Sequence, residues 1–233
     1  MVKFYLIPSL LHDSNTGVIP PQAAAALQVC TAIYAENLRT TRRFVKKILP
    51  QFVIDDAEWF EIGKAESECV AGFRQAVQHH QNIALISEAG CPAIADPGYL
   101  LVAEAHGTKG VEVVPIAGPS SILLALMASG LGGQRFAFHG YLPVEQNARR
   151  QALQKIWQRA KDDEATQLFM ETPYRNNSLL EDLLKTIPSQ AKLCIAANLT
   201  AQDEYVQMKT VAAWLQNPLP NLHKQPCIFA LAQ

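Results

Sequence analysis

Short apolar runs alternate with amphipathic segments along the first half of the chain, and this alternation predicts a series of βαβ units. Runs rich in β-branched and aromatic residues predict strands at residues 3–7, 32–36, 58–62, 82–86 and 111–116. The segments between them predict helices near residues 21–30, 38–48, 66–79 and 97–106. Strands that are apolar throughout and separated by helices are typical of a parallel sheet covered on both faces. We therefore expect the first half to be an α/β domain.

The alternation resumes after a glycine-rich stretch, GLGGQ at residues 130–134, which predicts a flexible joint. We expect an N-terminal domain of residues 1–130 and a C-terminal domain of residues 131–233. The later pattern predicts strands at residues 136–142, 166–171, 192–199, 204–211 and 226–232, with helices near 145–161 and 176–186. This second half is expected to hold a mixed sheet with helices.

Composition narrows the class of protein. The chain has 233 residues, is 49% hydrophobic and carries a net charge of -1, so bulk attraction to nucleic acid is excluded while a local basic patch remains possible. The 5 cysteines contain no CxxC pair, which argues against a disulfide framework or a cysteine zinc site. No segment approaches the roughly 20 apolar residues of a membrane span. We expect a soluble, cytoplasmic protein without a metal site and without a membrane partner.

Two corners rich in small residues follow predicted strands. SEAGCPAIADPG, residues 87–98, follows one strand, and AGPSSI, residues 117–122, follows the next. Ligands of parallel sheets bind outside the carboxyl ends of the strands. Neither corner has the glycine spacing of a dinucleotide or triphosphate site, and Glu88 would repel phosphate. The corners therefore predict a small neutral or cationic nucleoside held by main-chain groups. Asp96 is expected only to cap the helix that begins at Pro97.

A basic segment, NLRTTRRFVKK at residues 37–47, follows the strand at 32–36. Arg39 and Arg43 share a helical face with Lys46 or Lys47 because of their spacing. A solvated face is the ordinary interpretation of such a run, but the local charge and the position favour contact with nucleic-acid phosphates. The residues expected to bind the substrate are Arg39, Arg42, Arg43 and Arg175.

These segments resemble the motifs of a known family. The first corner is similar to SDAGTPGISDPG and the second to PGPSA, two motifs of the tetrapyrrole methylase superfamily, the class III S-adenosylmethionine-dependent methyltransferases. Within it, AENLRTTRRFVKK resembles the EDTRxTxxLL segment of the ribosomal RNA small subunit methyltransferase I family, FHGYLP its FxGFLP, METPYR its YESPHR and, more loosely, ANLTAQDE its RELTKxHE. The resemblance spans residues 3–232 in the same order.

The resemblance implies a two-domain tetrapyrrole methylase-like fold with S-adenosylmethionine in the cleft between the domains, ribosomal RNA as substrate, and a homodimer. Carried over by position, the cofactor contacts fall on Pro8, Glu88, Cys91, Ile94, Ser120, Ser121, Met170, Ala197 and Pro226. Simple alternatives stay open, because Ser120 and Ser121 suit a helix cap and Met170 suits a plain core strand. Cys91 is not expected to be a nucleophile, since no base is marked for it.

Methyl transfer from a sulfonium needs alignment more than a catalytic dyad. If the acceptor is a ribose 2′-hydroxyl, as the resemblance implies, Glu36 is the candidate for receiving its proton, although it could instead pair with Arg39. The first loop, IPSLLHDSNTGVIPP, lacks the glycines of the family's GTPIGNLxDIT. A small-molecule acceptor such as a tetrapyrrole therefore stays open, as does a non-catalytic module that binds RNA or nucleotide.

Overall fold

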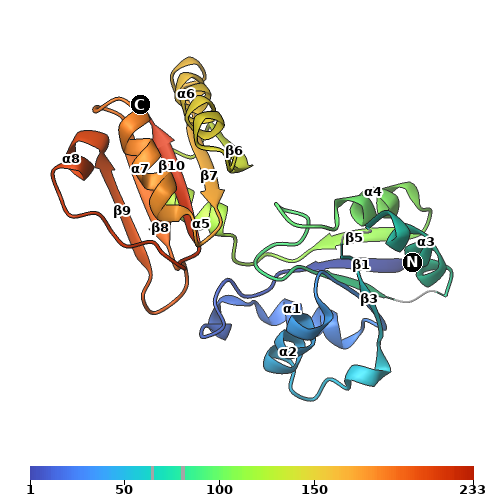
Figure 1. Ribbon diagram of the computed structural model, residues 1–233. Coiled ribbons are helices and arrows are strands. Elements are labelled where there is room, and N and C mark those ends of the chain that lie inside the picture. Colours follow the sequence, from blue (N-terminus) through green and yellow to red (C-terminus); the bar gives the residue numbers. More distant parts are fainter. Residues whose placement is uncertain (64–65, 80–81) are drawn as a thin grey trace. The chain divides into compact units, whose positions relative to one another are not determined.

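The chain folds into two compact units, Met1–Ser120 and Ser121–Gln233. The structure is a computed structural model that describes residues 1–63, 66–79 and 82–233 (Figure 1). Within these residues, each unit contains one five-stranded sheet. None of the helices described there is long and apolar enough to cross a bilayer. The α/β class expected from the pattern of the sequence is confirmed.

The sheet of the first unit is parallel throughout, with the strand order β3-β2-β4-β1-β5. Its strands are β1 (Val2–Ile7), β2 (Ala32–Ala35), β3 (Glu58–Glu61), β4 (Ile83–Ile86) and β5 (Val111–Pro115). Every residue of β2 and β4 is buried, which explains why these strands are continuous apolar runs. All five strands predicted for this half are present, including β3 at the edge.

Helices cover both faces of this sheet (Figure 1). α1 (Pro21–Gln28) and α2 (Leu38–Ile48) pack on one face, where Leu27 and Phe44 share a core with Ile86. α3 (Glu66–Gln78) and α4 (Tyr99–Gly107) pack on the other, where Phe73 and Leu101 share a core with Leu85. Ile86 and Leu85 are neighbours on β4, and their opposite faces follow from the alternation of side chains along a strand. The short 3-10 helices at Thr16–Val18 and Ile54–Asp56 were not predicted.

The start of α4 differs from the expectation. The predicted helix began at Pro97 with Asp96 as its cap, but α4 begins at Tyr99 and Gly98 occupies the N-cap position. Gly98 has a φ of 123°, and a Cβ atom there would lie 2.7 Å from Leu85. This backbone geometry interrupts the helix, so Asp96 and Pro97 belong to the loop before it.

The second unit has a mixed sheet in the order β6-β7-β10-β8-β9, as expected. Its strands are β6 (Phe136–Tyr141), β7 (Thr166–Glu171), β8 (Lys192–Ala197), β9 (Tyr205–Thr210) and β10 (Cys227–Ala232). β6 and β7 are parallel, whereas β10 is antiparallel to both β7 and β8. The last strand in the sequence therefore lies in the centre of the sheet.

Four helices accompany this sheet in the described part of the unit: α5 (Ser121–Ser129), α6 (Gln146–Asp162), α7 (Asn176–Thr186) and α8 (Val211–Leu215). α5 buries Ile122, Ala125 and Leu126 and packs on β8, β9 and β10. The predicted boundary at residues 130 and 131 lies after α5, whereas the division between the units lies before it. The reason is this packing, because a helix joins the unit that buries its apolar side.

A buried ion-pair network joins α6 to α7. The Asp182 carboxylate is 1% exposed and accepts hydrogen bonds from the Nε atoms of Arg149 and Arg150, each at 2.9 Å. Burial by itself would raise the pKa of Asp182, but hydrogen bonds from Arg149 and Arg150 hold it below its usual value. Arg149, which is 4% exposed, also donates from Nη1 to the carbonyl oxygen of Val144 at 3.0 Å. The network therefore fixes the segment that follows β6.

Candidate functional site

The carboxyl edge of the first sheet contains a topological switch point between β1 and β4. From β1 the chain crosses to β2 on one side, and from β4 it crosses to β5 on the other, although β1 and β4 are neighbours. Loops that leave such a pair of strands diverge and open a crevice, which is where ligands of open parallel sheets bind. The loop after β1 and the corner at residues 87–98 therefore flank the expected binding position.

Three loops meet at main-chain level at this edge. The Ser9 amide nitrogen donates to the carbonyl oxygen of Gly90 at 2.9 Å, which links the loop after β1 to the corner after β4. The Cys91 thiol donates to the carbonyl oxygen of Pro119 at 3.5 Å, which links that corner to the segment after β5. The two corners that the sequence singled out are thus in contact. Both corners consist mainly of small residues, as the sequence shows.

The corner after β4 has an unusual backbone. Ala93 and Ala95 have φ values of 63° and 64°, and Gly90 has a φ of 75°. Alanine in this left-handed region costs about 1–3 kcal/mol and persists only where the surroundings impose it. Such backbone geometry is concentrated at binding and catalytic sites. The strain in this corner therefore supports its assignment as a site rather than as a simple connection.

Carboxylates gather beside the same edge. Glu36, which follows β2, accepts a hydrogen bond at its Oε2 from the Glu88 amide nitrogen at 3.0 Å. The Thr40 hydroxyl on α2 donates to Glu88 Oε1 at 3.1 Å. Burial, together with the negative charges of Glu36 and Glu88, raises the pKa of Asp96 to about 7. This environment disfavours phosphate and suits a cation or a hydroxyl-bearing nucleoside.

The predicted cofactor residues of the first unit all lie in these loops or at their ends. Glu88, Cys91 and Ile94 lie in the corner after β4, and Pro8 directly follows β1. Burial raises the pKa of the Cys91 thiol, which favours its protonated form. Ser120 is the last residue of the first unit, and Ser121 is the first residue of the second unit and of α5. The two serines predicted to contact the cofactor therefore belong to different units.

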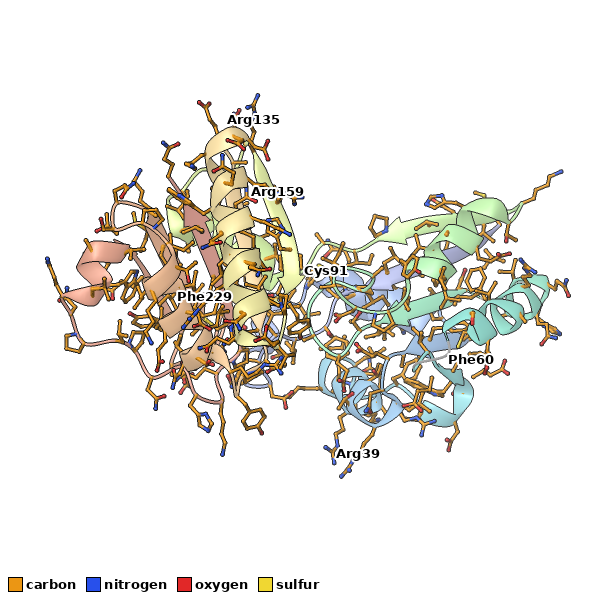
Figure 2. All side chains as sticks on the ribbon, turned by 45° about the horizontal axis from the view of Figure 1, so that its top comes forward. Arg39, Phe60, Cys91, Arg135, Arg159 and Phe229 are labelled. Carbon is orange, nitrogen blue, oxygen red and sulfur yellow. The ribbon has the colours of Figure 1, made fainter. Side chains whose placement is uncertain are left out.

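The basic segment forms α2, as predicted, with Asn37 as its N-cap. The Asn37 side chain accepts hydrogen bonds from the amide nitrogens of Arg39 at 3.0 Å and Thr40 at 3.2 Å. Arg39 and Arg43 are exposed, and neither guanidinium forms an ion pair with any other described residue. Figure 2 shows the Arg39 side chain extending away from the ribbon. Arg42 instead lies over the Trp59 ring, 5.1 Å from its centre.

The lysines of this helix have local partners that sequence reasoning missed. Lys46 donates from Nζ to the carbonyl oxygens of Pro50 and Phe52. Lys47 donates to the main-chain oxygen of Asp13 at 2.5 Å and forms an ion pair with its carboxylate at 3.5 Å. The sequence shows the charges but not the neighbouring carbonyl groups. The face that remains for an anion is therefore that of Arg39 and Arg43.

In the second unit, the three predicted contacts lie at one end of the sheet. Met170 and Ala197 stand at the carboxyl ends of β7 and β8, and Pro226 directly precedes β10, which lies between these two strands. The Asn198 amide nitrogen donates to the carbonyl oxygen of Pro226 at 3.0 Å, which ties the two segments together. The structure thus brings together residues that are far apart in the sequence.

Arg175 lies at the same end of the sheet but is already paired. Its Nη2 atom lies 2.5 Å from Oε1 of Glu171, a side chain that is fully shielded from solvent. This contact raises the pKa of Arg175, and the first cause is the hydrogen bond that its guanidinium donates to the Glu171 carboxylate. Glu171 neutralises much of the charge that the sequence assigned to phosphate binding. The role predicted for Arg175 remains a prediction.

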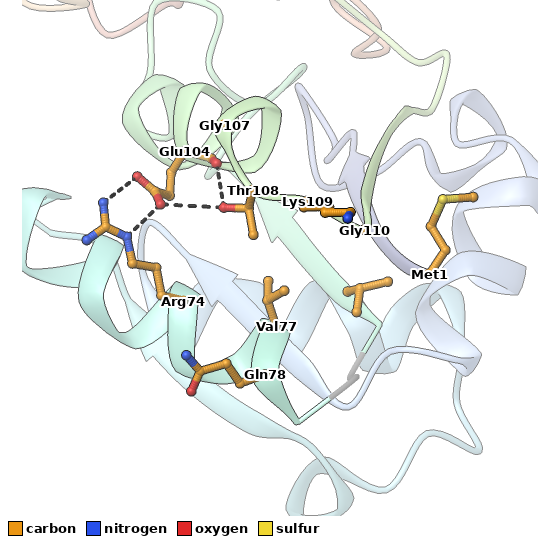
Figure 3. A pocket seen from close by; sticks show the side chains of 10 residues that line it. Met1, Arg74, Val77, Gln78, Glu104, Gly107, Thr108, Lys109 and Gly110 are labelled. Carbon is orange, nitrogen blue, oxygen red and sulfur yellow. Dashed lines mark hydrogen bonds and ion pairs between the residues drawn. The ribbon is translucent and has the colours of Figure 1, made fainter.

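A separate pocket of about 550 Å³ lies at the opposite edge of the first sheet (Figure 3). Its wall includes the Arg74–Glu104 ion pair, with Nε and Oε1 2.6 Å apart, and the residues that precede β1 and β5. It therefore lies at the amino ends of the strands, away from the three loops. Across the described ranges, no group of three or more His, Cys, Asp or Glu side chains could hold a metal ion.

Comparisons with known proteins agree with this geometry. The family model for tetrapyrrole (corrin/porphyrin) methylases matches residues 13–213. A protein of Synechocystis named ribosomal RNA small subunit methyltransferase I is 36% identical over 193 residues, which are 82% of this chain and 65% of the relative. A protein of the same name from Xylella fastidiosa is 33% identical over 94% of this chain and 78% of its own length.

Solved structures share the fold at low sequence identity. The methyltransferase CobJ is 14% identical and matches with a TM-score of 0.64 over 100% of this chain and 93% of its own. Uroporphyrin-III C-methyltransferase from Thermus thermophilus, in complex with S-adenyl homocysteine, is 16% identical and matches with a TM-score of 0.55 over 99% of this chain and 97% of its own. The chain spans less than two thirds of the length of the Synechocystis relative, at 65%.

Proposed function

The chain belongs to the tetrapyrrole (corrin/porphyrin) methylase family, and on that premise we propose that it transfers a methyl group from S-adenosylmethionine to RNA of the small ribosomal subunit. The observation that carries the proposal is the meeting of the loops after β1, β4 and β5 at the switch point. The names of the two relatives support the choice of RNA as substrate.

The residues at the switch point fit S-adenosylmethionine, which supplies a methyl group on a positively charged sulfur. A Cβ atom on Gly118 would lie 2.2 Å from Cγ of Pro8, so this position accepts only glycine and keeps main-chain groups accessible. The carboxylates of Glu36 and Glu88 suit the cationic ligand and its hydroxyl groups. The residues proposed to hold the cofactor are Pro8, Glu88, Cys91, Ile94, Ser120 and Ser121, with Met170, Ala197 and Pro226 from the second unit.

The acceptor proposed here is a ribose 2′-hydroxyl, which must lose its proton as the methyl group arrives. Glu36 is the proposed proton acceptor, because its carboxylate lies at the carboxyl edge and is oriented by the Glu88 amide. Arg39 and Arg43 are proposed to contact the phosphates of the RNA backbone. Arg42 and Arg175 are proposed as further contacts with the RNA. A free guanidinium pair one helical turn apart suits consecutive phosphates.

The decisive experiment is methyl transfer from tritiated S-adenosylmethionine to RNA extracted from small ribosomal subunits, followed by nuclease digestion and identification of the methylated nucleoside. A 2′-O-methylated nucleoside is the expected product, and a base-methylated nucleoside would contradict the ribose assignment. Label appearing only in added tetrapyrroles would favour the small-molecule alternative. Heat of S-adenosylmethionine binding in calorimetry, without transfer to either acceptor, would indicate a non-catalytic relative.

We propose further that the protein acts as a homodimer in the cytoplasm, where its RNA substrate is made. The mass of the particle in solution, measured by light scattering, tests the dimer directly. A monomer at micromolar concentration would contradict it. Fractionation of cells followed by immunoblotting tests the location.

A further inference from the structure

An exposed aromatic pair, Tyr174 and His223, has no role in the proposed methyl transfer. Tyr174 lies on the turn after β7. Tyr174 is 70% exposed, and its ring packs edge-on against the imidazole of His223, with ring centres 5.8 Å apart and an interplanar angle of 71°. His223 is also exposed and belongs to the segment that leads into β10. An edge-on contact leaves a face of a ring open to a third aromatic group.

The two segments that hold this pair are fastened to each other. The Lys224 amide nitrogen donates to the carbonyl oxygen of Pro173 at 2.9 Å. The Asn176 side chain, which is fully buried, donates from Nδ2 to the carbonyl oxygen of Gln225 at 2.7 Å. These bonds connect residues on either side of Tyr174 with residues that directly follow His223. The aromatic pair therefore stands on a fixed base.

A buried carboxylate holds the turn from inside. Glu171 Oε1 accepts a hydrogen bond from the Thr172 amide nitrogen at 2.6 Å and from Arg175 at 2.5 Å. The Arg175 amide nitrogen in turn donates to the carbonyl oxygen of Thr172 at 2.9 Å. Tyr174 lies inside this closed turn, so its main chain has little freedom left to lose on binding. Preorganisation of this kind reduces the entropic cost of recognition.

The surroundings of the pair indicate which ligand it suits. Lys224 directly follows His223 in the chain, is exposed and forms no ion pair within the described ranges, so its positive charge is available to a ligand of this segment. Tyr141, 58% exposed, ends β6 and is in register with Met170 of β7, which adds a second exposed tyrosine at this end of the sheet. Exposed aromatic rings with nearby cations bind the unstacked bases of single-stranded RNA, whereas duplex RNA hides its bases.

We propose that Tyr174 and His223 form a stacking platform for an unpaired nucleobase of the RNA substrate. This inference rests on the proposed function, and it specifies the class of substrate as a single-stranded or looped segment. Tyr174 lies on the turn that follows β7, and Met170, a proposed cofactor contact, is the second-last residue of that strand. A base stacked here would hold its nucleotide near the proposed methyl donor, so the platform would act on RNA affinity and position and leave cofactor binding unchanged.

The test compares the full-length protein with its variants Tyr174→Ala, Tyr174→Phe and His223→Ala. Affinity is measured by fluorescence anisotropy with a labelled single-stranded RNA from the small subunit and with the same RNA annealed into a duplex. Tyr174→Ala is expected to weaken single-strand binding about tenfold, and Tyr174→Phe, which keeps the ring, to retain it. Duplex affinity should change little. Phe136→Ala is the matched control, because Phe136 is an exposed ring, 44% accessible, at the other end of β6.

Three outcomes would overturn the platform. The first is a Tyr174→Ala variant that binds single-stranded RNA as tightly as the unaltered protein. The second is an equal loss in the Phe136→Ala control. The third is a loss of S-adenosylmethionine affinity in calorimetry with RNA affinity unchanged, which would assign the ring to the cofactor. If the unaltered protein methylates RNA in these cases, the proposed function stands; if it neither binds nor methylates RNA, both proposals fail.

Discussion

Gly118 packs directly against Pro8: a Cβ atom at position 118 would lie 2.2 Å from Cγ and 2.3 Å from Cβ of the proline ring. The loops after β1 and β5 are therefore closely packed, with only the Pro8 ring between the main chain of one loop and Gly118 of the other. β1 and β5 are neighbours in the sheet, so this contact sets the spacing of the loops on that side of the switch point.

Gly118→Ala should therefore separate these two loops. We expect a loss of about 1–3 kcal/mol in the free energy of unfolding, as for other overpacked sites, and at least a tenfold loss of S-adenosylmethionine affinity. Thermal denaturation and calorimetry measure the two effects. Gly107→Ala is the control, since a Cβ atom at Gly107 meets nothing within 4 Å. Unchanged cofactor affinity in Gly118→Ala would contradict the placement of the cofactor at this contact.

Glu36→Gln is expected to separate binding from chemistry. The amide oxygen of glutamine can still accept the hydrogen bond from the Glu88 main chain, now 3.0 Å long, so the loop should keep its shape. Removing a proton acceptor typically lowers kcat by about 100-fold or more. We expect this loss together with an unchanged Kd for S-adenosylmethionine, measured with tritium transfer and calorimetry. A variant with normal kcat would exclude Glu36 as the base.

Asp96 should make the stability of the fold depend on pH. Its pKa is about 7 in the folded protein and 3.8 ordinarily, so between these values the folded state binds more protons than the unfolded state. Stability is therefore expected to fall as pH rises from about 4 to 7, because ionised Asp96 then faces Glu36 and Glu88. Asp96→Asn should remove this slope and gain on the order of 2 kcal/mol at pH 8 after solvent screening.

Urea denaturation of the protein and the Asp96→Asn variant at pH 5 and pH 8 measures this effect. The variant should gain stability relative to the unaltered protein as the pH rises. Parallel pH profiles for the two proteins would show that the carboxyl of Asp96 titrates normally.

Arg39→Ala and Arg43→Ala should weaken RNA binding through charge. Each substitution is expected to lower the slope of log Kd against log salt concentration by about one, because each removes one phosphate contact. Arg159→Ala, on α6 of the second unit, is the control for a general loss of positive charge. Filter binding at several salt concentrations provides the slopes, and equal slopes in all three variants would contradict a specific contact through α2.

Arg149→Ala should destabilise the second unit more than Arg150→Ala. Arg149 is 4% exposed and donates two hydrogen bonds to Asp182, whereas the Arg150 side chain is 37% exposed. Removing one partner of a buried ion pair costs about 3–5 kcal/mol, because the remaining charge is left buried. Urea denaturation followed by circular dichroism measures both variants. A larger effect of Arg150→Ala would show that the shared carboxylate depends mainly on the outer arginine.

The regular elements could be predicted because their patterns are local. β2 and β4 are buried on both sides and read as uninterrupted apolar runs, and α2 has its cap and its amphipathic spacing in the sequence itself. The predicted start of α4 at Pro97 was wrong, because the conformation of Gly98 depends on its packing against Leu85, a residue of β4. The glycine-rich stretch after α5 predicted a domain boundary at residues 130 and 131, whereas the units divide between Ser120 and Ser121. The glycine content does not reveal on which sheet α5 packs.

The contact between the two corners of the candidate site follows from the sequence pattern, but the electrostatics of the candidate site do not. The corner containing Glu88 and Cys91 was identified from residue size and position. The elevated pKa of Asp96 could not be, because it depends on Glu36 and Glu88, which reach the same edge only through the topology of the sheet. Glu171 and Arg175 are only four residues apart in the sequence, but the sequence does not show that the Glu171 carboxylate is buried and pairs with Arg175. Both features depend on burial by residues that are distant in the sequence, and a single sequence does not show that burial.

The central position of β10 also governs how the protein can be made. Because β10 lies between β7 and β8, which both precede it, the second sheet consists of two separate strand pairs until Cys227–Ala232 have left the ribosome. The first unit has no such dependence and can fold while translation continues. Nascent chains stalled before Cys227 should therefore resist protease in the first unit and remain sensitive in the second, and a chain truncated there should fail as an enzyme however intact its first unit is.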